Sequence, residues 1–339
     1  MLSRRLLRFH EWVDALVILG VLFAVSGTYW DIQYHIDIGR DSFWIAPHRM
    51  VYAGIVLVFF TSLAALFYLK KIPAYRDTHK KFRTAVLLLF GSVTLFLLGA
   101  PFDELWHRLY GLDVTVWSPP HLYLIAAGFA IVLSLIYFQR LYLSVTRKDR
   151  VRHVSLDELG LELVCALGLV GLNIIFAEFE FFQDVVSYDF FHLRHNWIYL
   201  FGVSTIFVFV LSLAKTLTYM RWAATRIAFL YFAIRVLITI VLLSAGAGVS
   251  YPMLPAFAFI PAILFDMLYD RHRLLRVAVA SAVFVGVLYA VQTIVFSVEG
   301  ITKYLPSSSV EVALALLVGI VAGFSGSVLG RKILSRIRG

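Results

Sequence analysis

The chain has 339 residues, of which 61% are hydrophobic and 15% are charged, and its mean hydropathy is +0.85. Soluble domains are about half apolar and about one quarter charged, so this composition excludes a soluble globular protein and indicates a membrane protein. The net charge of +9 would suit nucleic acid, but the basic residues lie in short loops between apolar stretches, so we expect no nucleic-acid partner. A single cysteine, Cys165, excludes an intrachain disulfide.

Apolar stretches long enough to cross a bilayer follow one another along the whole chain. Ten predicted transmembrane helices cover approximately residues 12–34, 47–69, 84–106, 120–142, 159–180, 196–218, 226–246, 252–269, 277–296 and 310–330. The sequence therefore predicts an all-α, polytopic helix bundle of about ten transmembrane helices, whose first partner is the lipid bilayer.

Lysine and arginine give the predicted orientation, because they concentrate in cytoplasmic loops. If the N-terminus is cytoplasmic, 24 of the 30 basic residues fall on the cytoplasmic side and five on the opposite side. This asymmetry predicts a multi-pass protein of the cell membrane with both termini cytoplasmic. Arg235 falls inside a span, and we expect it to pair with Asp266.

The predicted outer side instead collects acidic residues and six of the ten histidines. Those six histidines are His35, His48, His107, His121, His192 and His195. The other four are expected to be solvated among cytoplasmic basic residues; they are His10, His79, His153 and His272.

Two outer hairpins, residues 28–54 and 101–128, repeat one pattern at an offset of 72 and then 73 residues. The matched pairs are Asp31 with Asp103, His35 with His107, Asp41 with Asp113, Trp44 with Trp117, and His48 with His121. A proline directly precedes the last histidine of each copy. We expect the two hairpins to superpose, with Trp44 and Trp117 as interfacial anchors.

The spacing within each copy predicts a metal site. An aspartate and a histidine four residues later lie on one helix face, one turn apart. Gly39 and Gly111 are expected to end the first helix of each hairpin, and the proline opens the second, so the following histidine lies in its first turn. Two imidazoles and one carboxylate suit zinc or copper(II), with one position left open. The two predicted sites are Asp31, His35 and His48, and Asp103, His107 and His121. Asp41 and Asp113 would either accept a proton from a ligand imidazole or serve loop solvation.

A third outer segment, residues 177–197, carries a weaker version of this chemistry. Glu180 and Asp184 are four residues apart, and His192 and His195 are three apart. These four residues are either a further metal site or an acidic interfacial loop, because the segment lacks the Pro-His and tryptophan features.

The first hairpin resembles a copper-binding motif in the C subunit of the particulate methane and ammonia monooxygenases. The motif appears as Asp31, His35, Arg40, Asp41, Trp44, Pro47 and His48. The second hairpin is similar to the other copper motif of that subunit, although Asp103 stands where the family has asparagine. The resemblance covers roughly residues 12–145, so residues 1–145 are interpreted as a duplicated metal-hairpin half, and residues 146–339 as further helices of the same membrane domain.

The resemblance implies a copper-dependent membrane monooxygenase component that works with other membrane subunits, with copper as the ion and zinc as the alternative. Such a protein would hold copper on the extracytoplasmic side and oxidise a small apolar substrate, or ammonia, with O2. The alternative is a membrane protein that binds or transports metal without chemistry. The sequence leaves open whether this chain is an enzyme and which residues are catalytic. The sequence indicates no specific function for residues 226–339.

Overall fold

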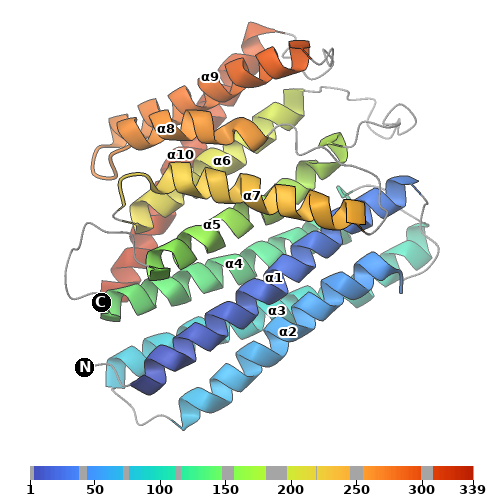
Figure 1. Ribbon diagram of the computed structural model, residues 1–339, viewed down its shortest axis with the longest axis vertical. Helices are drawn as coiled ribbons and strands as arrows, with labels where there is room; N and C mark the ends of the chain where they lie inside the picture. The colour runs from blue at the N-terminus through green and yellow to red at the C-terminus, as the bar shows by residue number, and fades with distance from the viewer. Residues whose placement is uncertain are drawn as a thin grey trace. The chain divides into compact units, whose positions relative to one another are not determined.

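The computed structural model describes residues 4–37, 44–71, 76–111, 116–146, 156–180, 197–218, 220–244, 255–298 and 308–338, and all regular structure in these ranges is helical (Figure 1). The α-helices are α1 (Arg4–Asp37), α2 (Ala46–Lys70), α3 (Arg76–Tyr110), α4 (Pro119–Thr146), α5 (Leu156–Asn173), α6 (Trp197–Leu217), α7 (Ala223–Ser244), α8 (Phe259–Leu268), α9 (Leu274–Val298) and α10 (Ser309–Arg338). Two short 3₁₀ helices are η1 (Ile174–Glu180) and η2 (Pro255–Ala258). The predicted all-α, polytopic bundle is confirmed.

Within the described residues, nine helices are long and apolar enough to cross a membrane. They match nine of the ten predicted spans. The exception is the stretch 252–269, whose described part forms η2 and the ten-residue α8. At 1.5 Å per residue, α8 is about 15 Å long, about half of the hydrocarbon core. A count of apolar residues predicted this helix, but it is too short to span alone.

The chain divides into two compact units. One unit comprises Met1–Glu178 with Val241–Gly248 and contains α1–α5, while the other comprises Phe179–Ile240 with Val249–Gly339. In the first unit, α1 packs mainly on α2, and α3 packs mainly on α4, so consecutive helices form antiparallel hairpins. Helix α5 packs on α4 and also touches α1.

Glycines allow α1 and α2 to approach closely. A Cβ atom placed on Gly27 of α1 would lie 2.7 Å from the backbone nitrogen of Val51 and 3.1 Å from the carbonyl oxygen of Pro47 on α2. Farther along, a Cβ atom on Gly54 would collide with the carbonyl oxygen of Gly20. Small residues at such crossings let helix backbones pack against each other in a membrane. The first hairpin therefore has a fixed separation between its two helices.

The cytoplasmic end predicted for α1 contains a buried histidine. His10 is 5% exposed, its Nε2 lies 2.9 Å from Asp14 Oδ2, and its ring stacks on Tyr142 and Phe138 of α4. The prediction that His10 is solvated is wrong, because α4 covers it with aromatic rings. His272 is exposed as predicted, whereas the side chains of His79 and His153 lie outside the described residues.

In the second unit, Asp266 binds a different partner from the one predicted. Its Oδ1 lies 2.8 Å from Lys215 Nζ, and its carboxylate accepts hydrogen bonds from the backbone nitrogens of Ala224 and Thr225. Asp266 therefore caps the first turn of α7, where a negative charge is favourable. The predicted pairing of Asp266 with Arg235 is wrong, because Lys215 and the start of α7 occupy both carboxylate oxygens; Arg235 is buried elsewhere on α7.

Replacing Asp266 by alanine is expected to destabilise the protein by about 3–5 kcal/mol, because it leaves the buried Lys215 ammonium without its counter-charge. Thermal unfolding in detergent measures the change. Adding Lys215→Met should recover part of the loss. Arg273→Ala, which removes an exposed ion pair to Asp270, is the control and should cost about 1 kcal/mol or less. Equal effects of Asp266→Ala and Arg273→Ala would contradict this assignment.

Candidate metal centres

The first hairpin brings its three predicted ligands together at its tip. Asp31 and His35 lie one turn apart near the end of α1. Helix α2 begins at Ala46 with Pro47 in its first turn, and the extended backbone of Ile45 precedes it. His48 follows Pro47 and therefore lies in the first turn of α2. The predicted role of the proline in starting the second helix is confirmed here.

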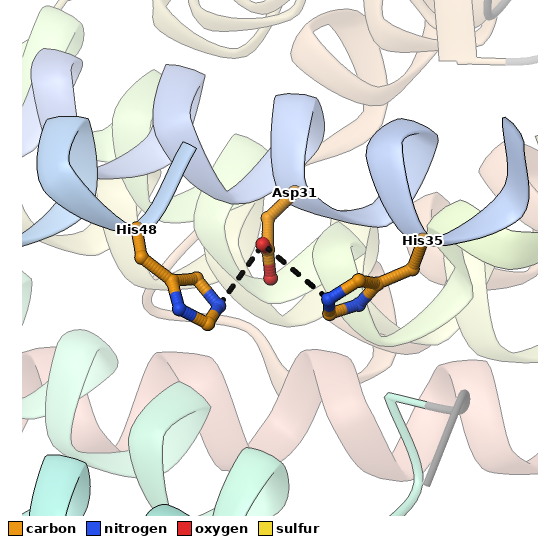
Figure 2. A group of neighbouring side chains, drawn as sticks. All are labelled: Asp31, His35 and His48. Carbon is orange, nitrogen blue, oxygen red and sulfur yellow. Dashed lines mark ion pairs between the residues drawn. The ribbon is translucent and has the colours of Figure 1, made fainter. Parts of the chain in front are cut away.

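The aspartate lies between the two imidazoles, as Figure 2 shows. Asp31 Oδ1 is 3.0 Å from His48 Nε2 and 3.8 Å from His35 Nε2. The two rings are nearly perpendicular, with centroids 6.0 Å apart. All three side chains are largely buried. We call Asp31, His35 and His48 the first triad.

The second hairpin builds the same arrangement. Asp103 Oδ1 is 3.2 Å from His107 Nε2 on the same helix and 3.3 Å from His121 Nε2 on α4. Helix α4 begins at Pro119, so His121 lies in its first turn. Asp103 and His107 are buried, and His121 is the more accessible ligand. We call Asp103, His107 and His121 the second triad; its match to the first supports the predicted repeat.

Gly111 ends α3 and also orients one ligand. Its φ of 86° lies in the left-handed region, and its backbone nitrogen donates to the His107 carbonyl oxygen at 3.0 Å. The His107 Nδ1 atom lies 3.2 Å from the Gly111 carbonyl oxygen. If Nδ1 carries the proton and donates it there, Nε2 is left with its lone pair facing Asp103. Gly111 therefore stops the helix, as predicted, and its carbonyl oxygen lies within hydrogen-bond distance of the His107 ring.

Replacing Gly111 by alanine is expected to cost about 1–2 kcal/mol, because an L side chain is strained at this positive φ. Thermal unfolding measures the loss. The matched control is Gly91→Ala in α3, where a Cβ meets nothing within 4 Å and helix propensity alone should add up to about 1 kcal/mol. Stabilisation by both substitutions would refute the role of Gly111.

The spacing of the donor atoms fits a small metal ion. Within each triad the three ligand atoms, one from each residue, all lie within 4.8 Å of one another. Ligands about 2.0–2.1 Å from a tetrahedral ion are about 3.3 Å from each other. The four measured carboxylate-to-imidazole distances run from 3.0 to 3.8 Å. Each triad could thus hold one ion with small side-chain movements and would leave one position open.

Both triads face one cavity inside the first unit. Its volume is about 130 Å³, and its lining includes Asp31, His35 and His48 of the first triad and Asp103 and His121 of the second. The two hairpin tips therefore lie at the same end of this unit. Most of the remaining lining is apolar side chains and glycines from α1, α2, α4 and α5.

Several predicted residues fall outside the described part of the chain. Gly39, Asp41, Asp113, Asp184, His192 and His195 lie in the gaps between described ranges. Glu180 is the last residue of η1, and its side chain is not described. A third metal group in residues 177–197 therefore stays a prediction.

Outside the triads, the repeat is less regular. Trp44 is 69% exposed, whereas Trp117 packs against Phe176. Sequence reasoning gave Asp113 two alternative roles, accepting a proton from a ligand imidazole or loop solvation, and it missed the Gly111 carbonyl. The signal was present, because Gly111 follows His107 by four residues at the end of the helix.

We compared the chain with protein-family models, with curated proteins and with solved structures, and none of the three comparisons found a match.

Proposed function

We propose that the protein binds copper at the two triads and acts as a component of a copper-dependent membrane monooxygenase. The observation that carries the proposal is that two matching sets of one carboxylate and two imidazoles each lie close enough to share an ion, and that five of these six residues line a single, mainly apolar cavity. The motif spacing in both hairpins, with its resemblance to the C subunit of methane and ammonia monooxygenases, supports the same conclusion. Zinc is the alternative ion for this donor set.

In the proposed copper sites, the imidazoles, the aspartates and the cavity wall have different roles. The imidazoles would bind as neutral rings, and the Gly111 carbonyl oxygen, 3.2 Å from His107 Nδ1, would accept the proton of that nitrogen. Asp31 and Asp103 each supply one negative charge against the cation in a largely buried position. Beyond the triads, most of the cavity wall is apolar. Copper, when bound, would supply the redox chemistry that activates O2, which zinc cannot supply.

The charge asymmetry supports an orientation for the proposed enzyme. With 24 of 30 basic residues on one side, both termini face the cytoplasm and both triads face outward. Other membrane subunits would complete the oxidase and deliver electrons.

A metal transporter fits the positions of the triads less well. Transporters hold their ions near the bilayer midplane, often on broken helices. Here His35 is two residues from the end of α1, and His48 is the third residue of α2. The second triad repeats these positions near the tip of its hairpin. Ligands at helix ends favour a fixed site over a transport path.

The test uses native membranes that contain either the wild-type chain or the His48→Ala/His121→Ala variant. Butane and ammonia are the substrates, a quinol is the reductant, and the O2 is labelled with ¹⁸O. Butane oxidation consumes one O2, two electrons and two protons per butane and gives one butanol and one water. We expect labelled product, butanol or hydroxylamine, only with the wild-type chain. If wild-type membranes gave no product from either substrate although both triads held copper, the monooxygenase function would be refuted. The protein would then be a metal-binding protein without catalysis.

A further inference from the structure

Basic side chains gather at one end of the second unit, where α6 and α8 end, α9 begins and α10 approaches its end. We call seven arginine and lysine side chains of this end the basic surface: Arg221, Arg271, Arg273, Arg276, Arg331, Lys332 and Arg336. Six of them are exposed, and Arg271 is half-buried. Among the described residues of this end, Asp270 is the one accessible carboxylate, because Asp266 is buried against Lys215. The basic surface therefore carries a large excess of positive charge.

The Tyr269 hydroxyl shows that separate parts of the basic surface meet. It donates to the Ser212 carbonyl oxygen of α6 at 3.1 Å and lies 2.7 Å from the Thr216 hydroxyl. The positive charges of Arg331 on α10 and Arg271 in the α8–α9 turn both act on this hydroxyl. The two arginines are 60 residues apart in the chain, so the fold, and not the local sequence, places them around one point.

The stability of α9 does not account for the arginines at its start. Arg273 directly precedes α9, and Arg276 is the third residue of that helix. Positive side chains are unfavourable at this end of a helix, because the helix dipole is positive there. The ion pair of Arg273 with Asp270 is exposed and long, at 3.9 Å, so it offsets little of this cost.

An apolar stripe on α8 leads toward the basic surface. The buried face of α8 includes Pro261, Ala262, Phe265 and Asp266. The exposed side chains of α8 form a stripe with helical spacing, which we call the α8 stripe: Ile260, Ile263, Leu264 and Met267. A short turn joins α8 to α9, and the two helices pack together. At about 15 Å, α8 matches the hydrocarbon depth of one leaflet.

We infer that the basic surface and the α8 stripe together bind one phospholipid with an anionic headgroup, from the leaflet on that side of the membrane. Arginine side chains bind phosphate oxygens through charge-assisted hydrogen bonds. Basic clusters next to transmembrane helices attract anionic lipids in this way. The acyl chains would lie along the α8 stripe. A soluble anion or an acidic protein segment would use the basic surface but would leave the α8 stripe unused.

The test measures lipid binding to the purified protein by native mass spectrometry, with phosphatidylglycerol and phosphatidylcholine of the same acyl chains. We expect the wild-type chain to bind one phosphatidylglycerol at least tenfold more tightly than phosphatidylcholine. One arginine near an anionic lipid contributes about fivefold in affinity. The variant Arg271→Gln/Arg273→Gln/Arg331→Gln should therefore lose the preference for phosphatidylglycerol. If this variant does not fold, Arg331→Gln alone should lower the affinity for phosphatidylglycerol about fivefold.

The matched control is Lys70→Gln/Lys71→Gln/Arg83→Gln, which removes three exposed charges from the same predicted side of the membrane in the other unit. It should keep the full preference. Three results would overturn the inference: no preference in the wild-type chain, equal losses in the control and in the basic-surface variant, or complete displacement of the lipid by an equal concentration of inorganic phosphate. The last result would assign the basic surface to a soluble anion. None of these measurements depends on metal at the triads.

Discussion

The variant His48→Ala/His121→Ala is expected to lose both bound copper equivalents. Each substitution removes one imidazole from one triad and leaves a carboxylate and a single histidine, which is too few protein ligands for a tight site. Each single variant should lose about one equivalent. The measurement is copper per chain after dialysis, by elemental analysis of purified protein. The helices should stay inserted, because insertion depends on the apolar spans.

His272→Ala is the matched control, because it removes an exposed histidine of the other unit. It should leave the copper content unchanged. Full copper content in the double variant would mean that copper binds elsewhere, and the triads would then be hydrogen-bonded structural groups.

Replacing Gly27 by alanine is expected to destroy the first site while leaving the second intact. The added Cβ would push against the backbone of Val51 and Pro47, so α2 must move away from α1. His48 follows Pro47 directly, and Asp31 lies one turn after Gly27. The displacement separates the two groups that now lie 3.0 Å apart. We expect the affinity of the first triad to fall at least about 100-fold, at the upper end of what supporting residues contribute.

The stability of this variant should fall by about 1–3 kcal/mol, as overpacking does. Gly91→Ala again provides the control, because it adds the same atom to an open helix face. Titration of each variant with copper separates the two sites. If Gly27→Ala kept two equal high-affinity sites, the close packing of α1 on α2 would not be what positions His48.

Local spacing made both triads predictable. A helix fixes Asp31 and His35 on one face, as it does Asp103 and His107. The prolines fix where the second helices begin, which places His48 and His121. The apolar spans were predictable for the same reason, because length and hydropathy are local properties.

Features that depend on tertiary packing were not predictable. His10 was expected in solvent, but rings from α4, more than a hundred residues away, cover it. Asp266 was assigned to Arg235, because nothing local reveals that Lys215 and the start of α7 meet it. The shared cavity forms only where several helices pack together. The length of α8 was overestimated, because its apolar composition resembles that of a full transmembrane span.

The measurement that tests the central claim most directly is anomalous diffraction at the copper edge from crystals of copper-loaded protein. The account predicts two peaks. One should lie about 2.0–2.1 Å from the Nε2 atoms of His35 and His48, and the other at the same distance from those of His107 and His121. Copper-loaded crystals with no peak in either triad would contradict it.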